Sequence, residues 1–205
     1  LTYEAAIALD KALHGDTEAQ KKVDLLTPVV KSWCTDLAQE VTYLAIQVHG
    51  GMGFIEETKV AQYYRDARIL PIYEGTNGIQ AADLAFRKVL HDNGQSAKTY
   101  IEELAKHLPE DYSGSVQALI DTTDYLLELG ANKNLDEVSA LCTPYLKGFG
   151  ILACAAHMHK SLKIAENRGE DFYRDKIRTA RFYLANILPL AKAHLEIAKN
   201  GSKEI

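Results

Sequence analysis

Residues 27–51 read TPVVKSWCTDLAQEVTYLAIQVHGG, and this stretch decides the predicted fold. Thr27 followed by Pro28 is typical of a helix N-cap and first turn, and Gly50 with Gly51 is typical of a helix end. Between them, apolar residues recur at steps of three and four, as on one face of an α-helix. They are Val30, Trp33, Cys34, Leu37, Val41, Leu44, Ala45 and Val48. We therefore expect an amphipathic helix from Thr27 to Gly50.

Helical periodicity continues along the rest of the chain, and strand signals are nearly absent. Further helices are expected over residues 56–68, from about Thr76 onward, and over residues 98–108, 116–129, 135–167 and 171–199. Pro144 and Pro189 fall inside two of these patterns, where each should mark a helix start or a kink. The connections are short, which favours antiparallel neighbours. The sequence therefore predicts an all-α protein built as an up-down helical bundle.

The polar, turn-rich segment His91–Ser96 is the best internal boundary. It separates a bundle region, residues 1–92, from a further helical region, residues 93–205. Within the bundle region, we expect the helices that begin at Thr27 and Thr76 to pack antiparallel through matching apolar stripes. The residues expected at this contact are Val30, Trp33, Leu37, Leu44, Ile79, Phe86 and Val89.

Composition excludes several classes of partner. The chain has 205 residues and a net charge of -5, and its charges form no basic stripe, so no nucleic-acid partner is expected. The longest apolar run, Phe149–Ala156, is shorter than the roughly 20 residues of a membrane span, so none is expected. Cys34, Cys142 and Cys154 are odd in number and form no CxxC pair. This pattern favours a reducing compartment, and we expect a cytoplasmic protein.

Cys154 and His157 share one face of a predicted helix, close to His159, which invites comparison with a metal-ligand set. No acidic or histidine partner stands at matching spacing. Packing is therefore the favoured role of these residues, and no metal site is expected.

Residues 73–80, Tyr-Glu-Gly-Thr-Asn-Gly-Ile-Gln, place a carboxylate directly before a predicted helix start. Gly75 would let another group approach the backbone closely, and the free N–H groups of a helix start can hold a polar oxygen. The stretch could therefore form a pocket floor around Glu74. Alternatively, Glu74 only complements the helix dipole while Thr76 or Asn77 caps the helix.

Residues 47–54, Gln-Val-His-Gly-Gly-Met-Gly-Phe, are glycine-rich but follow a predicted helix and not a strand. The stretch is therefore not a dinucleotide-binding fingerprint of the strand-turn-helix type. It reads as a helix C-cap whose exposed backbone amides could meet a phosphate. A plain C-cap at Gly50 and Gly51 remains the alternative.

These two stretches, together with Tyr-Arg-Asp-Ala-Arg at residues 64–68, resemble the C-terminal helical domain of the acyl-CoA dehydrogenases in their order and spacing. The resemblance extends from roughly Tyr3 to Leu90, so residues 1–92 are identified with that domain's four-helix-bundle region. Residues 93–205 resemble the C-terminal extension of one bacterial branch of the family, which includes enzymes acting on 3-methylthiopropanoyl-CoA and on longer acyl-CoAs.

The resemblance implies a catalytic role for Glu74 as the base that removes the proton next to the thioester carbonyl. A hydride then passes from the neighbouring carbon to FAD, giving a trans-2-enoyl-CoA. The backbone N–H of Glu74 is implied to help hold the thioester oxygen. Tyr73 and Gly75 are implied to shape the floor under the acyl chain.

Three positions match residues that contact FAD in the family: Gln47, Gly51 and Thr76. Gly78 stands where several relatives carry a glutamine that also contacts FAD, which leaves Asn77 or Gln80 as a substitute for it. Because the flavin is bound mainly by the neighbouring subunit in this family, the resemblance implies a homo-oligomer, a dimer or a tetramer.

The implied partners are an acyl-CoA substrate and electron-transferring flavoprotein. The family's N-terminal helical domain and middle β-domain are not among these 205 residues. We therefore expect the chain by itself to be a fragment that is inactive and does not retain FAD. Two alternatives stay open: a non-catalytic helical oligomerisation or interaction bundle, and an acyl-CoA oxidase-type relative.

Overall fold

The computed structural model describes residues 1–204 and contains helices but no strand in that range. The helices are α1 (Thr2–Leu13), α2 (Thr17–His49), α3 (Gly51–Phe54), α4 (Val60–Ala67), α5 (Asn77–Ala82), α6 (Gln95–Ala105), α7 (Ser113–Ala131), α8 (Leu135–Ala165), α9 (Asp171–Phe182) and α10 (Leu188–Gly201). Two π-helical segments, Asp83–Val89 and Tyr183–Ile187, continue α5 and α9. Short 3-10 turns lie at Glu56–Thr58, Glu110–Tyr112 and Ser202–Glu204. The predicted all-α class is confirmed.

The predicted start of the long helix at Thr27 is wrong, because α2 already begins at Thr17. The side chain of Asp16 caps α2 by accepting a hydrogen bond from the backbone N–H of Ala19 at 2.9 Å. Pro28 therefore lies inside the helix and not in its first turn.

The cost of Pro28 is offset by burial on the same helix. A proline in a helix interior costs about 3 kcal/mol because it removes one backbone hydrogen bond and crowds the preceding turn. Leu25 and Leu26, three and two residues before Pro28, are almost completely buried. Fully burying two such side chains contributes about 3–6 kcal/mol, enough to keep the helix continuous through the proline.

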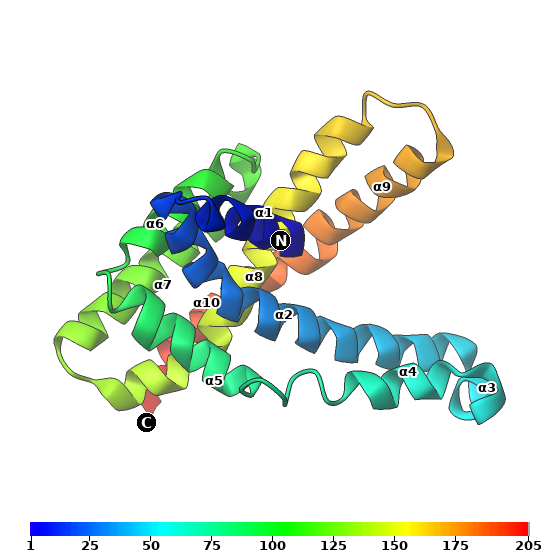
Figure 1. Cartoon of the computed structure of the whole chain (residues 1–205), viewed down its shortest axis with the longest axis horizontal. Coiled ribbons are helices and arrows are strands. Elements are labelled where there is room, and N and C mark those ends of the chain that lie inside the picture. The colour runs from blue at the N-terminus through cyan, green and yellow to red at the C-terminus, as the bar shows by residue number, and fades with distance from the viewer. Residues whose placement is uncertain (205) are drawn as a thin grey trace.

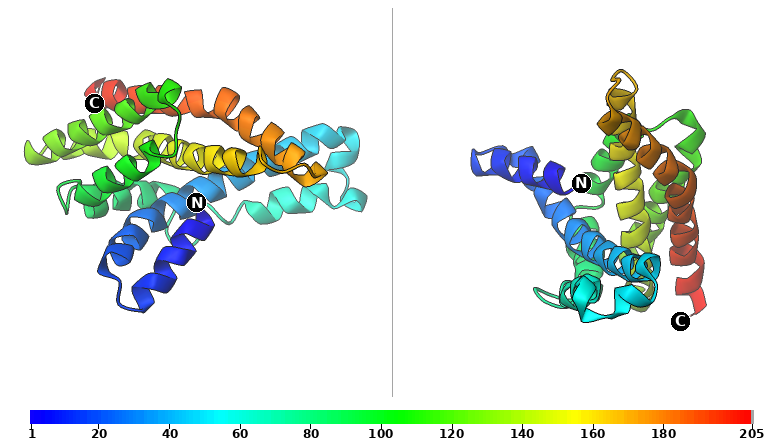
Figure 2. Two further views of the ribbon diagram at one scale, coloured as in Figure 1. Left: turned by 90° about the horizontal axis from the view of Figure 1, so that it is seen from above. Right: turned by 90° about the vertical axis from the view of Figure 1, so that its right-hand side faces the viewer.

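The helices run back and forth, and α8 is the central one. Figure 1 shows α1 folded back on the first part of α2, while α4 and α5 return antiparallel along the rest of α2. In Figure 2, α8 lies between α2 on one side and α9 and α10 on the other. Pro144 lies inside α8, and Pro189 stands in the first turn of α10, directly after a π-helical segment.

One hydrophobic core joins the two predicted regions. Leu26 and Leu84 from the first region and Tyr145 and Phe149 from the second belong to the same buried cluster. The rings of Tyr145 and Phe149 meet edge to face with their centroids 6.0 Å apart. The division near residue 92 stays a prediction.

The antiparallel contact between α2 and α5 is present, but it uses fewer residues than predicted. Trp33 and Val89 are buried. Leu37, Leu44 and Ile79 are instead 37%, 48% and 61% exposed. The end of α2 extends beyond the core as an arm covered only by α3 and α4, so its outward face has no neighbour within the described chain.

By length and composition alone, α8 could cross a membrane, since its most apolar window has a mean hydropathy of 1.3. The sequence predicted no apolar stretch long enough for a membrane span. The stretch in α8 is longer than predicted, because helical residues on both sides of Phe149–Ala156 extend it. Within the fold, 67% of that window is buried. Core helices of globular proteins pass the same test, so this is weak evidence for a membrane span.

Candidate active site

A short loop between α4 and α5 holds Tyr73, Glu74, Gly75 and Thr76, all exposed (Figure 1). Glu74 has a φ of 55° and Gly75 a φ of 84°. A left-handed conformation costs an ordinary residue roughly 1–2 kcal/mol, so it persists at Glu74 only where the surroundings hold it. The consecutive positive φ angles turn the chain sharply into α5 and explain why position 75 is glycine.

The Thr76 side chain caps α5, accepting a hydrogen bond from the backbone N–H of Ile79 at 3.4 Å. The predicted cap at this helix start is therefore confirmed. The carboxylate of Glu74 accepts no hydrogen bond and forms no ion pair with any other described residue. Capping of α5 thus occupies Thr76 and leaves the Glu74 carboxylate available.

Asn77 ties the loop to α2. Its side-chain nitrogen donates to Asp36 Oδ1 at 2.7 Å, to Thr35 Oγ1 at 2.9 Å and to the Ser32 carbonyl at 3.2 Å. Its side-chain oxygen accepts from Lys31 Nζ at 2.8 Å. Lys31 and Asp36 were not predicted at this site, because they lie on a helix more than 35 residues upstream and carry no local motif.

The side chains of Asn77 and Gln80, offered as substitutes for a missing flavin contact, already have hydrogen-bond partners in the chain. Both polar atoms of the Asn77 side chain are used in the contacts with α2. The side-chain nitrogen of Gln80 donates to the Glu74 carbonyl at 3.1 Å. These contacts give both side chains a role in shaping the loop itself.

Gln47 and Gly51 lie apart from this loop, at the far end of the arm where α2 meets α3 (Figure 1). Gly50 ends α2 with a φ of 58° and donates its N–H to the Gln47 carbonyl at 3.1 Å, so the predicted C-cap is present. Helix α4, about 12 Å long at 1.5 Å per residue, separates Gln47 and Gly51 from Glu74. The predicted residues therefore form two groups on one arm.

Gly53, two residues after Gly51, allows α3 to pack against the end of α2, a role that was not predicted. A Cβ at this position would lie 2.6 Å from the Ile46 carbonyl oxygen, so only glycine lets α3 pack against the end of α2. At Gly51, by contrast, a Cβ would meet nothing within 4 Å, and the backbone there is open to an incoming group.

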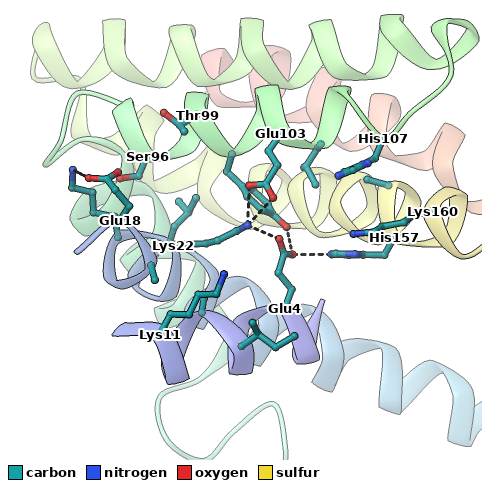
Figure 3. Close-up of a pocket in the computed structure, with 18 of the residues that line it drawn as sticks. Glu4, Lys11, Glu18, Lys22, Ser96, Thr99, Glu103, His107, His157 and Lys160 are labelled. Atoms are coloured by element: carbon teal, nitrogen blue, oxygen red, sulfur yellow. Dashed lines mark hydrogen bonds and ion pairs between the residues drawn. The ribbon is translucent and has the colours of Figure 1, made fainter. Parts of the chain in front are cut away.

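A cleft of about 880 Å³ lies elsewhere, between α1, α2, α6 and α8 (Figure 3). None of the predicted site residues lines it. On its floor, Lys22 Nζ lies 2.8 Å from Glu4 Oε1 and 2.8 Å from Glu103 Oε2. Tyr100 donates its hydroxyl to Glu4 Oε2 at 2.6 Å, and His157 Nε2 lies 2.8 Å from the same oxygen.

These groups satisfy one another, and the cluster Glu4, Lys22, Tyr100, Glu103 and His157 joins the four helices around the cleft. Burial by itself would raise the pKa of Glu4. Hydrogen bonds from His157, Lys22 and Tyr100 outweigh that effect and lower the pKa of Glu4 to about 2. The cluster therefore acts as a structural connection within the fold.

The residues considered for a metal have other partners. His157 contacts Glu4, and Cys154 Sγ accepts a hydrogen bond from the indole N–H of Trp33 at 3.2 Å. The ring of His159 contacts the His107 carbonyl. Among residues 1–204, no group of three potential ligands lies close enough together to hold a metal ion.

Two family models match consecutive parts of the chain. The model described as "Acyl-CoA dehydrogenase, C-terminal domain" matches residues 1–88, and the model described as "Acetyl-CoA dehydrogenase C-terminal like" matches residues 85–205. Together they place the chain among the helical C-terminal domains of flavin-dependent dehydrogenases. The chain belongs to the acyl-CoA dehydrogenase family.

Curated relatives agree with this assignment. The chain is 38% identical to a 3-methylmercaptopropionyl-CoA dehydrogenase of Ruegeria pomeroyi, over 94% of this chain and 37% of the relative. It is 30% identical to a broad-specificity linear acyl-CoA dehydrogenase of Mycobacterium tuberculosis, over 98% of this chain and 37% of the relative. It is 36% identical, over 39% of its length, to 19% of a caffeyl-CoA reductase-Etf complex subunit of Acetobacterium woodii. The chain thus spans about a third of the first two relatives.

Proposed function

We propose that the protein containing this chain dehydrogenates an acyl-CoA thioester to a trans-2-enoyl-CoA, with Glu74 as the base. The observation that carries this proposal is the state of the Glu74 carboxylate. It is exposed, unpaired within the described chain, and held at a strained φ of 55° on a loop tied to α2. A carboxylate kept free on a fixed backbone fits a group that must accept a proton from a bound substrate.

In this mechanism, Glu74 accepts the proton from the carbon next to the thioester carbonyl. The electron pair of that C–H bond forms the new double bond, and a hydride leaves the adjacent carbon. FAD, when bound, supplies the acceptor for that hydride. The backbone N–H of Glu74 has no acceptor among residues 1–204 and would donate to the thioester oxygen, which strengthens the acidity of the proton being removed.

The residues proposed to bind FAD lie at two places on the arm, and this separation suits contact with an extended dinucleotide. Gln47 is exposed and the backbone at Gly51 is open, so this end can receive a phosphate-bearing portion. Thr76 lies with Tyr73 and Gly75 in the loop, where the acyl chain and the flavin edge would meet Glu74. Each group offers one edge of a binding site, which supports the proposal that the chain by itself does not retain FAD.

A homo-oligomer is proposed because the arm exposes large apolar side chains. Val48 is 85% exposed and Phe54 80% exposed, while Val41, Met52 and Tyr63 are each more than half exposed. Apolar patches of this kind mark surfaces that another domain or subunit covers. We propose that the remainder of the protein or a second copy covers the arm.

Electron-transferring flavoprotein is the proposed electron acceptor, supported by the relative whose name places it in an Etf complex. A non-catalytic bundle and an oxidase-type relative are the competing functions. Reduction of electron-transferring flavoprotein by the complete protein supports the dehydrogenase, whereas peroxide release during turnover would identify an oxidase.

Glu74→Gln in the full reading frame tests the base directly. The amide keeps the shape of the side chain but cannot take a proton, so flavin reduction by acyl-CoA should fall by about 10²–10⁴ or more. Stopped-flow absorbance measures this rate, and the dissociation constant of the substrate should change little. Glu170→Gln, an exposed glutamate before α9, is the matched control. Near-normal reduction by Glu74→Gln would remove Glu74 from the mechanism.

A further inference from the structure

The two peptide groups that follow Glu74 are each held by a side chain from elsewhere. Gln80 Nε2 donates to the Glu74 carbonyl at 3.1 Å, and Lys31 Nζ donates to the Gly75 carbonyl at 2.7 Å. In a trans peptide the carbonyl and the following N–H point in opposite directions. These two contacts therefore turn the N–H groups of Gly75 and Thr76 away from Gln80 and Lys31.

Those N–H groups remain free. The backbone nitrogens of Glu74, Gly75 and Thr76 have no acceptor anywhere in residues 1–204. By contrast, the next backbone nitrogen, that of Asn77, donates to the Pro71 carbonyl at 3.0 Å. The loop thus has three consecutive N–H groups without an acceptor, while the carbonyls of Glu74 and Gly75 are held by Gln80 and Lys31.

Lys31 itself is aligned by a polar relay. The Asn77 side chain accepts from Lys31 through Oδ1 at 2.8 Å and donates through Nδ2 to Asp36 Oδ1 at 2.7 Å. Both hydrogen bonds have an ionised partner, which makes them stronger than neutral ones and sets the orientation of the amide. Lys31 forms no ion pair among the described residues, so its ammonium donates to the two neutral oxygens of Gly75 and Asn77.

From this arrangement we infer that Lys31, Asn77 and Gln80 are positioning residues for the Glu74 base. They fix the direction of the Glu74–Gly75 and Gly75–Thr76 peptides and thereby hold Glu74 at its positive φ. The hydrogen bonds that Lys31 and Asp36 of α2 form with Asn77, and that Lys31 forms with the Gly75 carbonyl, stabilise this strained backbone. This inference rests on the proposed function, in which Glu74 accepts the substrate proton.

Two variants of the relay test the inference in the full-length holoenzyme. Lys31→Met keeps the aliphatic stem and removes the ammonium, and Asn77→Asp places a second carboxylate against Asp36. Because a misplacement of about 1 Å can cost about 10²-fold in rate, flavin reduction should fall by about 10- to 100-fold in each variant. The dissociation constant of the acyl-CoA should stay within about threefold, since the carboxylate and the binding surface are intact.

The exchange variant Asn77→Asp/Asp36→Asn provides the rescue. Asp at position 77 can accept a hydrogen bond from Lys31, and Asn at position 36 can donate one to the carboxylate at position 77. The relay is therefore restored with the amide and the carboxylate exchanged. Flavin reduction should return to within about threefold of the wild type. A merely structural role predicts instead a lower melting temperature in the single variants, with normal reduction rates in every variant that is folded and loaded with FAD.

Lys98→Met is the matched control, because it removes a lysine whose 2.6 Å contact with Asp124 joins α6 and α7 away from the loop. Normal reduction rates in folded Lys31→Met and Asn77→Asp would overturn the inference. If Asn77→Asp does not fold, the flavin-reduction rates of Lys31→Met and of the exchange variant test the inference. If flavin reduction is slow in Glu74→Gln but normal in Lys31→Met, the positioning inference is refuted and the proposed function stands. If flavin reduction is normal in Glu74→Gln, the proposed function itself is refuted.

Discussion

At the residue scale, the contacts of the loop between α4 and α5 identify the capping residue of α5, while the role of Glu74 stays a prediction. Thr76 caps α5, as expected if either Thr76 or Asn77 provides the cap. Glu74 is left without a partner among the described residues and with a backbone conformation that ordinary residues avoid. Strain at a free carboxylate is a pattern common at reactive sites, since the surroundings must hold it there.

Gly75→Ala should destabilise the protein by about 1–2 kcal/mol. The φ of 84° at this position disfavours any side chain, and the new Cβ would lie 3.2 Å from Gln80 Nε2, against the hydrogen bond to Glu74. Urea denaturation followed by circular dichroism measures the change. Gly169→Ala, where a Cβ meets nothing within 4 Å, should unfold like the wild type. Equal stability of the two variants would show that the loop relaxes freely.

At the scale of elements, the close crossing of α2 and α8 fixes the base of the arm on which the site residues lie. Gly150 of α8 allows this approach, because a Cβ there would lie 2.8 Å from Cγ of the Trp33 ring. The indole N–H of Trp33 is in turn satisfied by Cys154 one helical turn later. Helix α2 therefore carries the arm outward from a tightly packed contact at its middle.

Gly150→Ala tests this crossing. Overpacking costs about 1–3 kcal/mol, and the gain in helix propensity returns at most about 1 kcal/mol, so a net destabilisation is expected. Gly114→Ala in α7, where the space is open, should leave stability unchanged or raise it by less than about 1 kcal/mol. Thermal unfolding of both variants measures the difference. A stabilised Gly150→Ala would mean that α2 and α8 separate without cost.

At the scale of the whole molecule, residues 1–92 and residues 93–204 are joined by both the core and the polar cluster on the floor of the cleft (Figure 3). Glu4 and Lys22 belong to the first region, and Tyr100, Glu103 and His157 belong to the second. Ionisation of Glu4 therefore contributes to holding α1 and α2 against α6 and α8.

The lowered pKa of Glu4 predicts how stability depends on pH. A carboxyl group with a pKa of about 2 in the folded state and 4.5 as its ordinary value favours folding above pH 4.5. That contribution, about 3 kcal/mol at most, is lost as the pH falls from about 4.5 towards 2. Glu4→Gln should be less stable at pH 7 and lose less stability over this range.

Denaturant titrations at several pH values check this prediction. Glu18→Gln is the control, because the ion pair of Glu18 with Lys21 is exposed to solvent and should contribute little to stability. Parallel pH profiles for the wild type and Glu4→Gln would contradict a stabilising role for the Glu4 carboxylate.

Much of the fold follows from patterns that are local in the chain. The three- and four-residue apolar steps predicted helices at residues 98–108, 116–129 and 135–167, and α6, α7 and α8 occupy these places. Local spacing failed at α2, where the proline at position 28 suggested a start. Burial of Leu25 and Leu26 against other helices instead keeps the helix continuous to Asp16.

By itself, the sequence determined the helical class, the family resemblance and the place of Glu74 before a capped helix, because periodicity, capping and motif spacing are properties of neighbouring residues. The roles of Glu74, Gln47, Gly51, Thr76, Tyr73 and Gly75, and the cytoplasmic location, stay predictions. Only the tertiary structure decided that Lys31 and Asp36 hold the loop through Asn77, and that Gln47 and Gly51 stand at the opposite end of the arm. These arrangements depend on how α4 and α5 return along α2, and contacts between residues distant in sequence leave no signal in local periodicity.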